Sequence, residues 1–373
     1  MVLGITLILV AAVLASYLPT RVEESMEYHV FQVGKQTYVT LNGDFGRNDG
    51  NLTASVDSDG VLSISISGQT AESGRLFQWT VFDDDHPFMT GDWLGTVYAG
   101  VVTEGNQPSL SLGSQYGSYS LSVRCFDNSS KQSQRAEYKG EVIYSKPVEI
   151  LYEWEYEGIR YKLDTSFNYS EYVHYKKIDV AGRGVMPFGQ YGKFITPSDL
   201  VIVDIASKLR NAYGYPDEHN RFAGFVLSFV QMCFEYPLHT DLISADEYKH
   251  GVKEYFAFPL ETLFNGGGDC EDTSILLTSI YIALGMDSAL VFLPNHVMSG
   301  VRVDGYVSVN RDPLRYEALI DADGGFLACE TTVDELIDVG IVPFVDVGGH
   351  PYSYYLGKES PLGDTYGFYP MGP

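Results

Sequence analysis

One cysteine of this chain lies where it could act as a nucleophile. Residues 266–285 are GGGDCEDTSILLTSIYIALG, so Cys270 follows three glycines and Asp269. The glycines permit a sharp turn, and Asp269 is placed to cap the helix that follows. Cys270 would then occupy the first helical turn, where unpaired backbone N–H groups and the helix dipole favour a thiolate. This pattern predicts a nucleophile at a helix start.

A base for this thiol follows in the sequence. Residues 288–294 (SALVFLP) and 297–303 (VMSGVRV) have the composition of buried strands, which puts His296 at a strand edge. An imidazole at that edge could take the thiol proton and stabilise the thiolate as an ion pair. We therefore expect His296 to lie beside the start of the Cys270 helix.

A third group should orient the imidazole. Glu330 ends the strand FLACE and is followed by two threonines, so its carboxylate is one candidate. Asp321 and Asp323, in the turn DADGG before that strand, are the alternatives. The sequence predicts that one of these three acids holds a ring nitrogen of His296.

Two further residues could support the site. Gln231 is the odd polar residue of a nearly apolar helix expected at 221–236, and a side-chain amide can stabilise the charge that develops in acyl transfer. Its alternative role is a structural hydrogen bond, because a buried amide must find partners. Asp269 would support the site from the helix start, beside the backbone N–H of Cys270, which is the better-placed oxyanion donor.

The same residues have simpler interpretations. A buried cysteine is often a small core residue, and the acids Asp269, Glu271 and Asp272 would raise the pKa of Cys270 against the effect of the helix dipole. His296 alone would fit a hydrogen-bonded residue at a strand end. A metal site in GGGDCED is not favoured, because its side chains would point in different directions and no HxxxH or CxxC pair adds ligands. We expect neither a metal nor an organic cofactor.

Five ordered motifs between residues 152 and 347 carry a family resemblance. They are FVLSFVQ, FPLETL, GGGDCEDTSILL, LPNHVMSGV and CETT. Together they resemble the archaeal membrane-associated transglutaminase-like proteins, within the transglutaminase-like branch of the papain-type cysteine enzymes. The resemblance implies that Cys270 is the nucleophile, His296 the base and Glu330 the orienting acid. Glu330 departs from the wider superfamily, which usually has Asp in a DxT motif there.

Composition limits the partners. The 373 residues include 49 Asp and Glu against 24 Lys and Arg, for a formal net charge of −25. A surface this acidic repels nucleic acid and anionic lipid headgroups, so we expect no nucleic-acid partner. The glycines before Cys270 lack the Lys and Ser/Thr of a phosphate-binding loop.

The amino-terminal segment indicates where the protein acts. Residues 2–18 form a 17-residue run without a charge. Residues 1–19 are therefore expected to be a membrane anchor, with a cleaved signal peptide as the alternative. The expected location is the cell membrane, single-pass with the body outside the cytoplasm, or secretion if the segment is removed. Sequons at Asn51, Asn128 and Asn168 agree with export.

The predicted fold class follows from the pattern along the chain. Residues 28–147 alternate apolar and polar residues in eight or nine short segments, which predicts an all-β sandwich of immunoglobulin-like architecture. Residues 148–347 should form an α+β transglutaminase-like (papain-like) domain by resemblance. Residues 348–373 are a Gly-, Tyr- and Pro-rich tail. With the N-terminal hydrophobic helix, this completes the expected fold.

These observations predict an exported, membrane-tethered cysteine enzyme that acts on amide or peptide bonds. Its thiolate would form a thioester that water or an amine resolves, so peptidase, amidase and transglutaminase-type acyl transfer share the first half of the mechanism. A protein or peptide, such as an envelope polymer, is the expected substrate. The alternative is a non-catalytic cell-surface binding or scaffold protein that retains the fold. The acids around Cys270 favour this alternative, and the intact Cys–His pair favours an enzyme.

Overall fold

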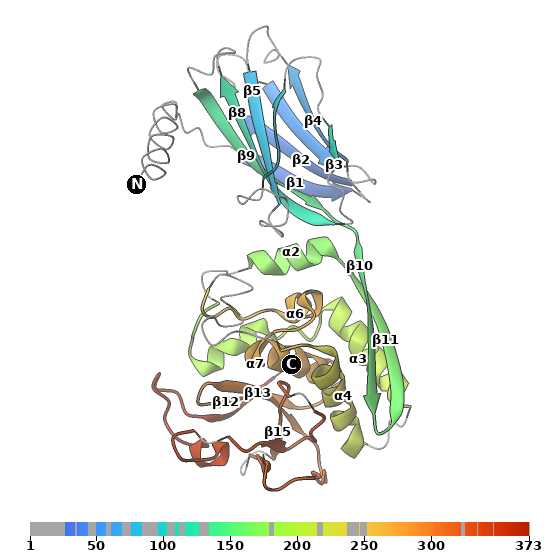
Figure 1. Cartoon of the computed structure of the whole chain (residues 1–373), viewed down its shortest axis with the longest axis vertical. Helices are drawn as coiled ribbons and strands as arrows, with labels where there is room; N and C mark the ends of the chain where they lie inside the picture. Colours follow the sequence, from blue (N-terminus) through green and yellow to red (C-terminus); the bar gives the residue numbers. More distant parts are fainter. Residues whose placement is uncertain are drawn as a thin grey trace, which may run out of the picture. The chain divides into compact units, whose positions relative to one another are not determined.

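The computed structural model divides the chain into two compact units (Figure 1). The first unit extends to Pro147 and includes Asn168–Ser170, and the second comprises Val148–Phe167 and the chain from Glu171 onward. The structure describes residues 27–372 except 34–35, 44–49, 57–60, 69–75, 84–95, 103–108, 112–115, 127–133, 179–182, 215–218, 237–245, 247–251, 322–324, 334 and 346.

The first unit consists of two antiparallel sheets. One has the strand order β1-β2-β3-β4-β7 and the other β6-β5-β8-β9. In chain order the strands are β1 (Glu27–Val33), β2 (Gln36–Gly43), β3 (Gly50–Val56), β4 (Val61–Gly68), β5 (Leu76–Asp83), β6 (Thr96–Val102), β7 (Ser109–Ser111), β8 (Gly117–Phe126) and β9 (Gln134–Tyr144). The alternating segments of the sequence thus become strands, because alternation places one set of side chains on each face of a sheet.

A long hairpin opens the second unit. Strands β10 (Pro147–Tyr156) and β11 (Ile159–Asn168) are joined by Glu157 and Gly158, which both have positive φ. Two such residues suit the tight turn whose twist matches that of paired strands. Along β10 the buried side chains alternate with exposed ones, and Trp154 on its buried face contacts Phe225 and Phe229 of α4 (His219–Cys233).

Helices and one four-stranded sheet form the rest of the second unit. The other helices are α2 (Tyr169–Lys177), η3 (Phe188–Phe194), α3 (Leu200–Tyr213), α6 (Pro259–Asn265), α7 (Cys270–Ala283) and η4 (Tyr352–Tyr355). The sheet has the antiparallel order β15-β13-β12-β17, formed by Phe326–Cys329, His296–Arg302, Ser288–Leu293 and Gly367–Met371. Strands β14 (Tyr316–Ala318) and β16 (Ile341–Pro343) pair separately. The tail thus supplies an edge strand to the main sheet.

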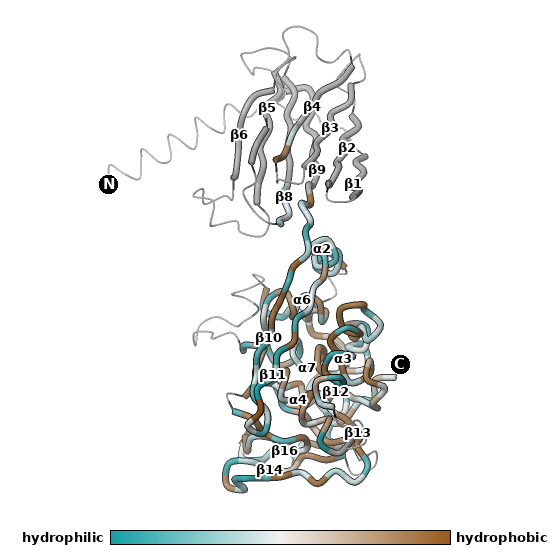
Figure 2. Tube along the Cα trace, turned by 90° about the vertical axis from the view of Figure 1, so that its right-hand side faces the viewer, coloured by the Kyte–Doolittle hydropathy of each residue, from teal (hydrophilic) through white to brown (hydrophobic). Residues whose placement is uncertain are grey.

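Helix α7 is the centre of the second unit. Every residue from Glu271 to Tyr281 is buried, and the helix is in contact with α3, α4 and α6 as well as with β12 and β13. Figure 2 shows hydrophobic residues along α4 and α7, in contrast to the hydrophilic stretches of β10 and β11. Because α7 is covered on all sides, the atoms at its first turn are held by many neighbours.

A fully buried ion pair connects the segments that lead into α7. Arg183 donates to Glu261 of α6 at 2.6 Å, and both side chains are almost completely buried. The same guanidinium donates to the carbonyls of Tyr175, Ile178 and Phe256. A buried charge is tolerated when it is paired and hydrogen-bonded, and Arg183 meets both conditions.

This architecture corrects the expected fold class. In the parts of the chain that the structure describes, no helix is long and apolar enough to cross a membrane. The expected hydrophobic helix, within residues 1–19, lies outside those parts. The fold has mixed α and β content with several small sheets, so the prediction of an immunoglobulin-like sandwich followed by a papain-like α+β domain is wrong as a description of this chain. After α7 the strands are short and separated by turns rich in Gly, Pro and Asp, which divide the backbone pairing among sheets.

Packing around Phe292 of β12 provides a test of this core. Its ring stacks on Phe188 of η3 at 4.3 Å and meets Tyr369 of β17 edge-on at 5.4 Å. Because Phe292 is fully buried, Phe292→Ala should lower the free energy of unfolding of the second unit by about 3–5 kcal/mol. Leu151→Ala, at a side chain that is 60% exposed, is the control and should change it by less than about 0.5 kcal/mol. Denaturant-dependent hydrogen exchange in peptides of the second unit measures both, and equal effects would contradict the packing described.

Candidate active site

The glycines before Cys270 allow two chain segments to touch. Gly266 ends α6 with a φ of 70°, and its carbonyl accepts a hydrogen bond from the N–H of Glu235 at 3.1 Å. Gly267 pairs with Glu235 in a parallel bridge, and a Cβ at Gly267 would overlap the Glu235 carbonyl oxygen. The turn therefore needs glycine for close backbone approach, and it fixes where α7 begins.

Cys270 is the first residue of α7, and Asp269 occupies the N-cap position. The predicted start of the helix at Cys270 is confirmed. The predicted cap is not, because the Asp269 side chain makes no capping hydrogen bond. Instead its backbone carbonyl accepts from both the N–H and the hydroxyl of Thr273, at 3.2 and 2.8 Å. The carboxyl group of Asp269 is thereby left to interact with the acids around it, as described below.

The Cys270 thiol is surrounded by groups that keep it protonated. Its sulfur donates to Glu271 Oε2 at 3.1 Å. Burial raises the pKa of the thiol well above its ordinary value, and the charges of Glu271 and Asp269 raise it further, while the backbone N–H of Val297 acts in the opposite direction. Burial and the acids thus outweigh the helix dipole that the sequence suggested would favour the thiolate.

His296 and Glu330 form a buried, charge-assisted pair. His296 Nε2 lies 2.6 Å from Glu330 Oε2, and Glu330 Oε1 accepts from the backbone N–H and the hydroxyl of Thr332 at 2.8 and 2.7 Å. Burial lowers the pKa of His296, but Glu330 and Asp269 more than offset this, so the net pKa is raised. Burial raises the pKa of Glu330, yet His296 and Thr332 outweigh it and leave this pKa lowered.

The other acid candidates are placed differently. Asp321 lies in the turn before β15, where its N–H donates to the carbonyl of Phe326, so it precedes the strand that Glu330 follows. Asp323 lies outside the described residues. Of the two candidates that the structure describes, Glu330 is the acid that lies on the imidazole.

The nucleophile candidate and the base candidate are neighbours without a direct bond. Both residues are described, and the structure shows no hydrogen bond between the Cys270 sulfur and the His296 ring. They are linked through the next residue, because the N–H of Val297 contacts the sulfur and its carbonyl accepts from Ser274 of α7 at 3.2 Å. The hydroxyls of Thr273 and Thr331 also bond at 2.8 Å, which joins α7 to the segment of Glu330.

Gln231 holds the backbone next to the His296–Glu330 pair. Its Nε2 donates to the backbone carbonyl of Glu330 at 2.9 Å and to that of Ile337 at 3.2 Å. Both amide hydrogens are used on carbonyls, so this group is not free to donate to an oxyanion. As placed, Gln231 holds the backbone of Glu330 in position, which corresponds to the structural alternative given by the sequence.

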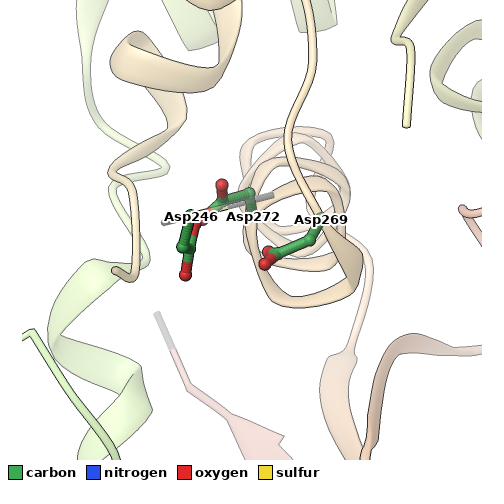
Figure 3. A group of neighbouring side chains, drawn as sticks. All are labelled: Asp246, Asp269 and Asp272. Atoms are coloured by element: carbon green, nitrogen blue, oxygen red, sulfur yellow. The ribbon is translucent and has the colours of Figure 1, made fainter. Parts of the chain in front are cut away.

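A cluster of carboxyl groups formed by Asp246, Asp269 and Asp272 lies at the start of α7 (Figure 3). Oxygens of Asp246, Asp269 and Asp272 lie within 4.8 Å of one another, and so do those of Asp246, Glu254 and Glu271. Oxygen ligands of this kind suit hard divalent cations, so these are the described residues that could hold a metal ion. Two of the acids already accept backbone hydrogen bonds, Asp246 from Tyr255 at 2.5 Å and Asp272 from Ala257 at 2.7 Å.

Like charges in this cluster favour protonation of some of its members. Burial raises the pKa of Glu271 and of Asp272 well above the ordinary range, and the charge of Asp269 adds to both effects. The pKa of Glu254 is raised for the same two reasons. Sequence reasoning missed Asp246 and Glu254, because they lie upstream of α6 and no spacing relates them to Cys270. The only available signal was the length of the loop that carries them, since long loops often cover a site.

Comparisons with known proteins leave this site without a family assignment. No family model and no curated protein matches the chain. Among solved structures, the chain is similar to a crystal structure described as a "putative protease" from Parabacteroides distasonis ATCC 8503. The TM-score is 0.26 at 11% sequence identity, and the match covers 78% of this chain and 68% of that chain. A TM-score this low does not establish a shared fold, so the interpretation of the site depends on its own geometry.

The glycine turn gives a prediction about the helix start. Gly267→Ala should displace the turn from Glu235, because the added Cβ would meet backbone that cannot rotate away. We expect the free energy of unfolding to fall by more than about 2 kcal/mol and the reactivity of Cys270 towards alkylating agents to change. Gly189→Ala is the matched control, since a Cβ there meets nothing within 4 Å. Indistinguishable unfolding of the two variants would show that close approach at Gly267 is unimportant.

The carboxyl cluster gives a prediction about pH. Because the folded protein raises the pKa of Glu271 and Asp272 above their unfolded values, it holds more protons than the unfolded chain. This contribution favours folding at pH values below the ordinary carboxyl range and is lost as the pH rises through the raised pKa values. Glu271→Gln should therefore reduce the loss of stability between pH 5 and 8, as measured by urea denaturation at a series of pH values. An unchanged or steeper loss in the variant would contradict the raised pKa of Glu271.

Proposed function

We propose that the second unit is a cysteine enzyme that acts on amide or peptide bonds. Cys270 would be the nucleophile, His296 the base and Glu330 the acid that orients the base. The observation that carries the proposal is the 2.6 Å contact between His296 Nε2 and Glu330 Oε2, buried next to the first turn of α7. An imidazole held on one nitrogen by a carboxylate keeps its other nitrogen available as a base.

The environment of the thiol indicates how this base would act. A preformed ion pair requires a thiol pKa below that of the imidazole, and both burial and the neighbouring acids raise the pKa of Cys270. The thiol would therefore start protonated and lose its proton to His296 as it attacks. The sulfur would add to the substrate carbonyl carbon and the carbonyl oxygen would take up the negative charge. Backbone N–H groups of the first turn of α7 are suited to stabilise that charge.

Collapse of this intermediate would complete the first half of the reaction. The protonated His296 would return its proton to the leaving nitrogen, the C–N bond would break, and a thioester to Cys270 would remain. Water or an amine would then attack the thioester and lose a proton to His296. The C–S bond would break to give a carboxylic acid or a new amide, and His296 would return the proton to the Cys270 sulfur. Hydrolysis is the outcome that we favour, as the transglutaminase-like resemblance of the five motifs suggests for peptide bonds of an envelope or surface polymer.

The same resemblance supports a location outside the cytoplasm. The sequons agree with an exported protein, and the substrate that we propose is a protein or peptide. Membership of the transglutaminase-like proteins is likewise a proposal, supported by the order of the motifs and by the position of Glu330 on His296.

A second candidate function has its own observation. The Cys270 thiol donates to Glu271, and no hydrogen bond joins it to His296 although both are described. This favours a binding or scaffold protein of the cell surface in which Cys270 is structural. The two functions differ in one property, the dependence of the thiol's reactivity on His296.

Alkylation of the full chain by iodoacetamide tests this dependence. If His296 accepts the thiol proton, labelling of Cys270 should rise as the pH passes the raised pKa of the imidazole, above its ordinary 6.5. His296→Ala should remove that rise and slow labelling at neutral pH by about 100-fold. Mass spectrometry locates the label, and Cys233, a free and partly exposed thiol whose pKa burial raises to about 12, is the reference within the same molecule.

The opposite outcome is equally clear. Labelling of Cys270 that has the pH dependence of an isolated thiol, and that His296→Ala leaves unchanged, would overturn the enzyme proposal in favour of the binding protein. Glu330→Gln separates the roles within the pair. It should lower the pKa of His296 and reduce labelling less than His296→Ala does, because the base remains present.

A further inference from the structure

A tyrosine from the C-terminal tail lies flat against the His296 ring. The ring centroids of Tyr352 and His296 are 5.7 Å apart and their planes differ by 11°. Tyr352 is the first residue of η4 and is buried, with 7% of its surface exposed. The sequence did not single it out, because only the folding of the tail onto the second unit brings it to the site.

The Tyr352 ring is held firmly on its other sides. It belongs to a hydrophobic cluster whose buried members include Leu293 and Met298, which flank His296 in the hairpin of β12 and β13. Its backbone N–H donates to Glu317 Oε1 of β14 at 2.9 Å, and the hydroxyl of Ser353 donates to Glu317 Oε2 at 2.6 Å. One carboxylate thus fixes the start of η4, and the packed ring cannot tilt without disturbing the cluster.

The charges around the pair give this stack a chemical consequence. Glu330 faces His296 from the end of β15, and Asp269 influences it from the N-cap of α7. Burial raises the pKa of Tyr352 to about 12, with added effects from Glu330, Cys270 and Glu317, so its ring stays a neutral phenol. The face of a neutral aromatic ring attracts a cation, and a protonated imidazole is one.

We propose that Tyr352 is a positioning residue for His296, which fixes the plane of the imidazole so that Nε2 stays on Glu330 and Nδ1 is left to exchange the proton of Cys270. The role of Nδ1 in this inference rests on the proposed function. The stacking of Tyr352 on His296 is independent of that function. A residue with only a packing role would affect stability and leave the titration of His296 unchanged.

Two substitutions separate the ring from its hydroxyl. Tyr352→Leu keeps an apolar side chain but removes the aromatic face, so the pKa of His296 should fall by about half a unit to one unit. Labelling of Cys270 at neutral pH should slow by about tenfold, because the base is no longer held in one orientation. Tyr352→Phe keeps the aromatic face, so the pKa of His296 should not change and the labelling rate of Cys270 should stay within about twofold of wild type. If Tyr352→Leu does not fold, Tyr352→Met fills the same space more flexibly and is expected to give the same shifts.

The matched control is another tyrosine of the same short helix. Tyr354 stacks on His350 with ring centroids 3.6 Å apart and is 43% exposed. Tyr354→Leu should leave the pKa of His296 and the labelling of Cys270 unchanged. NMR of the histidine rings in the full chain measures the pKa of His296 directly, with His296→Ala used to assign its signal.

The two readouts keep the failures apart. If Tyr352→Leu or Tyr352→Met folds and the pKa of His296 matches that of wild type, the positioning role is wrong, even where wild-type Cys270 labels in a His296-dependent way. If the pKa of His296 falls in Tyr352→Leu as expected, but labelling of Cys270 in the wild type does not depend on His296, the stack is confirmed and the proposed function fails. The role of Tyr352 in catalysis then fails as well.

Discussion

The start of α7 depends on the buried pair of Arg183 and Glu261. The guanidinium uses its donors on Glu261 and on three backbone carbonyls, and it packs against the rings of Tyr255 and Phe258 at 4.6 and 5.1 Å. Glu261 in turn accepts from the Tyr255 hydroxyl and from the N–H of Phe258, which fixes the first turn of α6. Since α6 runs directly into the glycine turn, loss of either charge would leave the other buried and unpaired, and the position of Cys270 would be lost with it.

This framework forces several carboxyl groups into one place. Fixing residues 255–258 brings the N–H of Ala257 to Asp272 of α7 and that of Tyr255 to Asp246. Asp246 thereby lies close to Asp269 and Asp272 on one side and to Glu254 and Glu271 on the other. The cost is like-charge repulsion in a buried region, which the protein can relieve by keeping protons on some of these groups. The thiol shares this environment, and its protonated state is a direct consequence of how α7 is anchored.

Much of the site followed from local signals in the sequence. The glycines and Asp269 predicted a helix beginning at Cys270. The strand-like composition of residues 288–294 and 297–303 placed His296 at a strand edge, and His296 is the first residue of β13. The spacing of apolar residues in 270–284 by itself indicates one buried face for this helix, whereas the structure buries every residue from Glu271 to Tyr281. The period of apolar residues identifies one face that a helix buries, but it does not indicate how many neighbouring elements cover the other faces.

Other features had no local signal. The fold class was wrong because the pairing of short strands into separate sheets depends on turns and on long-range contacts. The approach of Tyr352 to His296 depends on the tail adding β17 to the main sheet, a pairing that nothing near either residue encodes. The site therefore holds two hydrogen-bonded pairs of different origin, Cys270 with Glu271 and His296 with Glu330. Local sequence sets the first pair and tertiary packing sets the second. In the proposed mechanism a proton leaves the first pair for the second, so the proposed reactivity would depend on how closely packing brings Nδ1 of His296 to the sulfur.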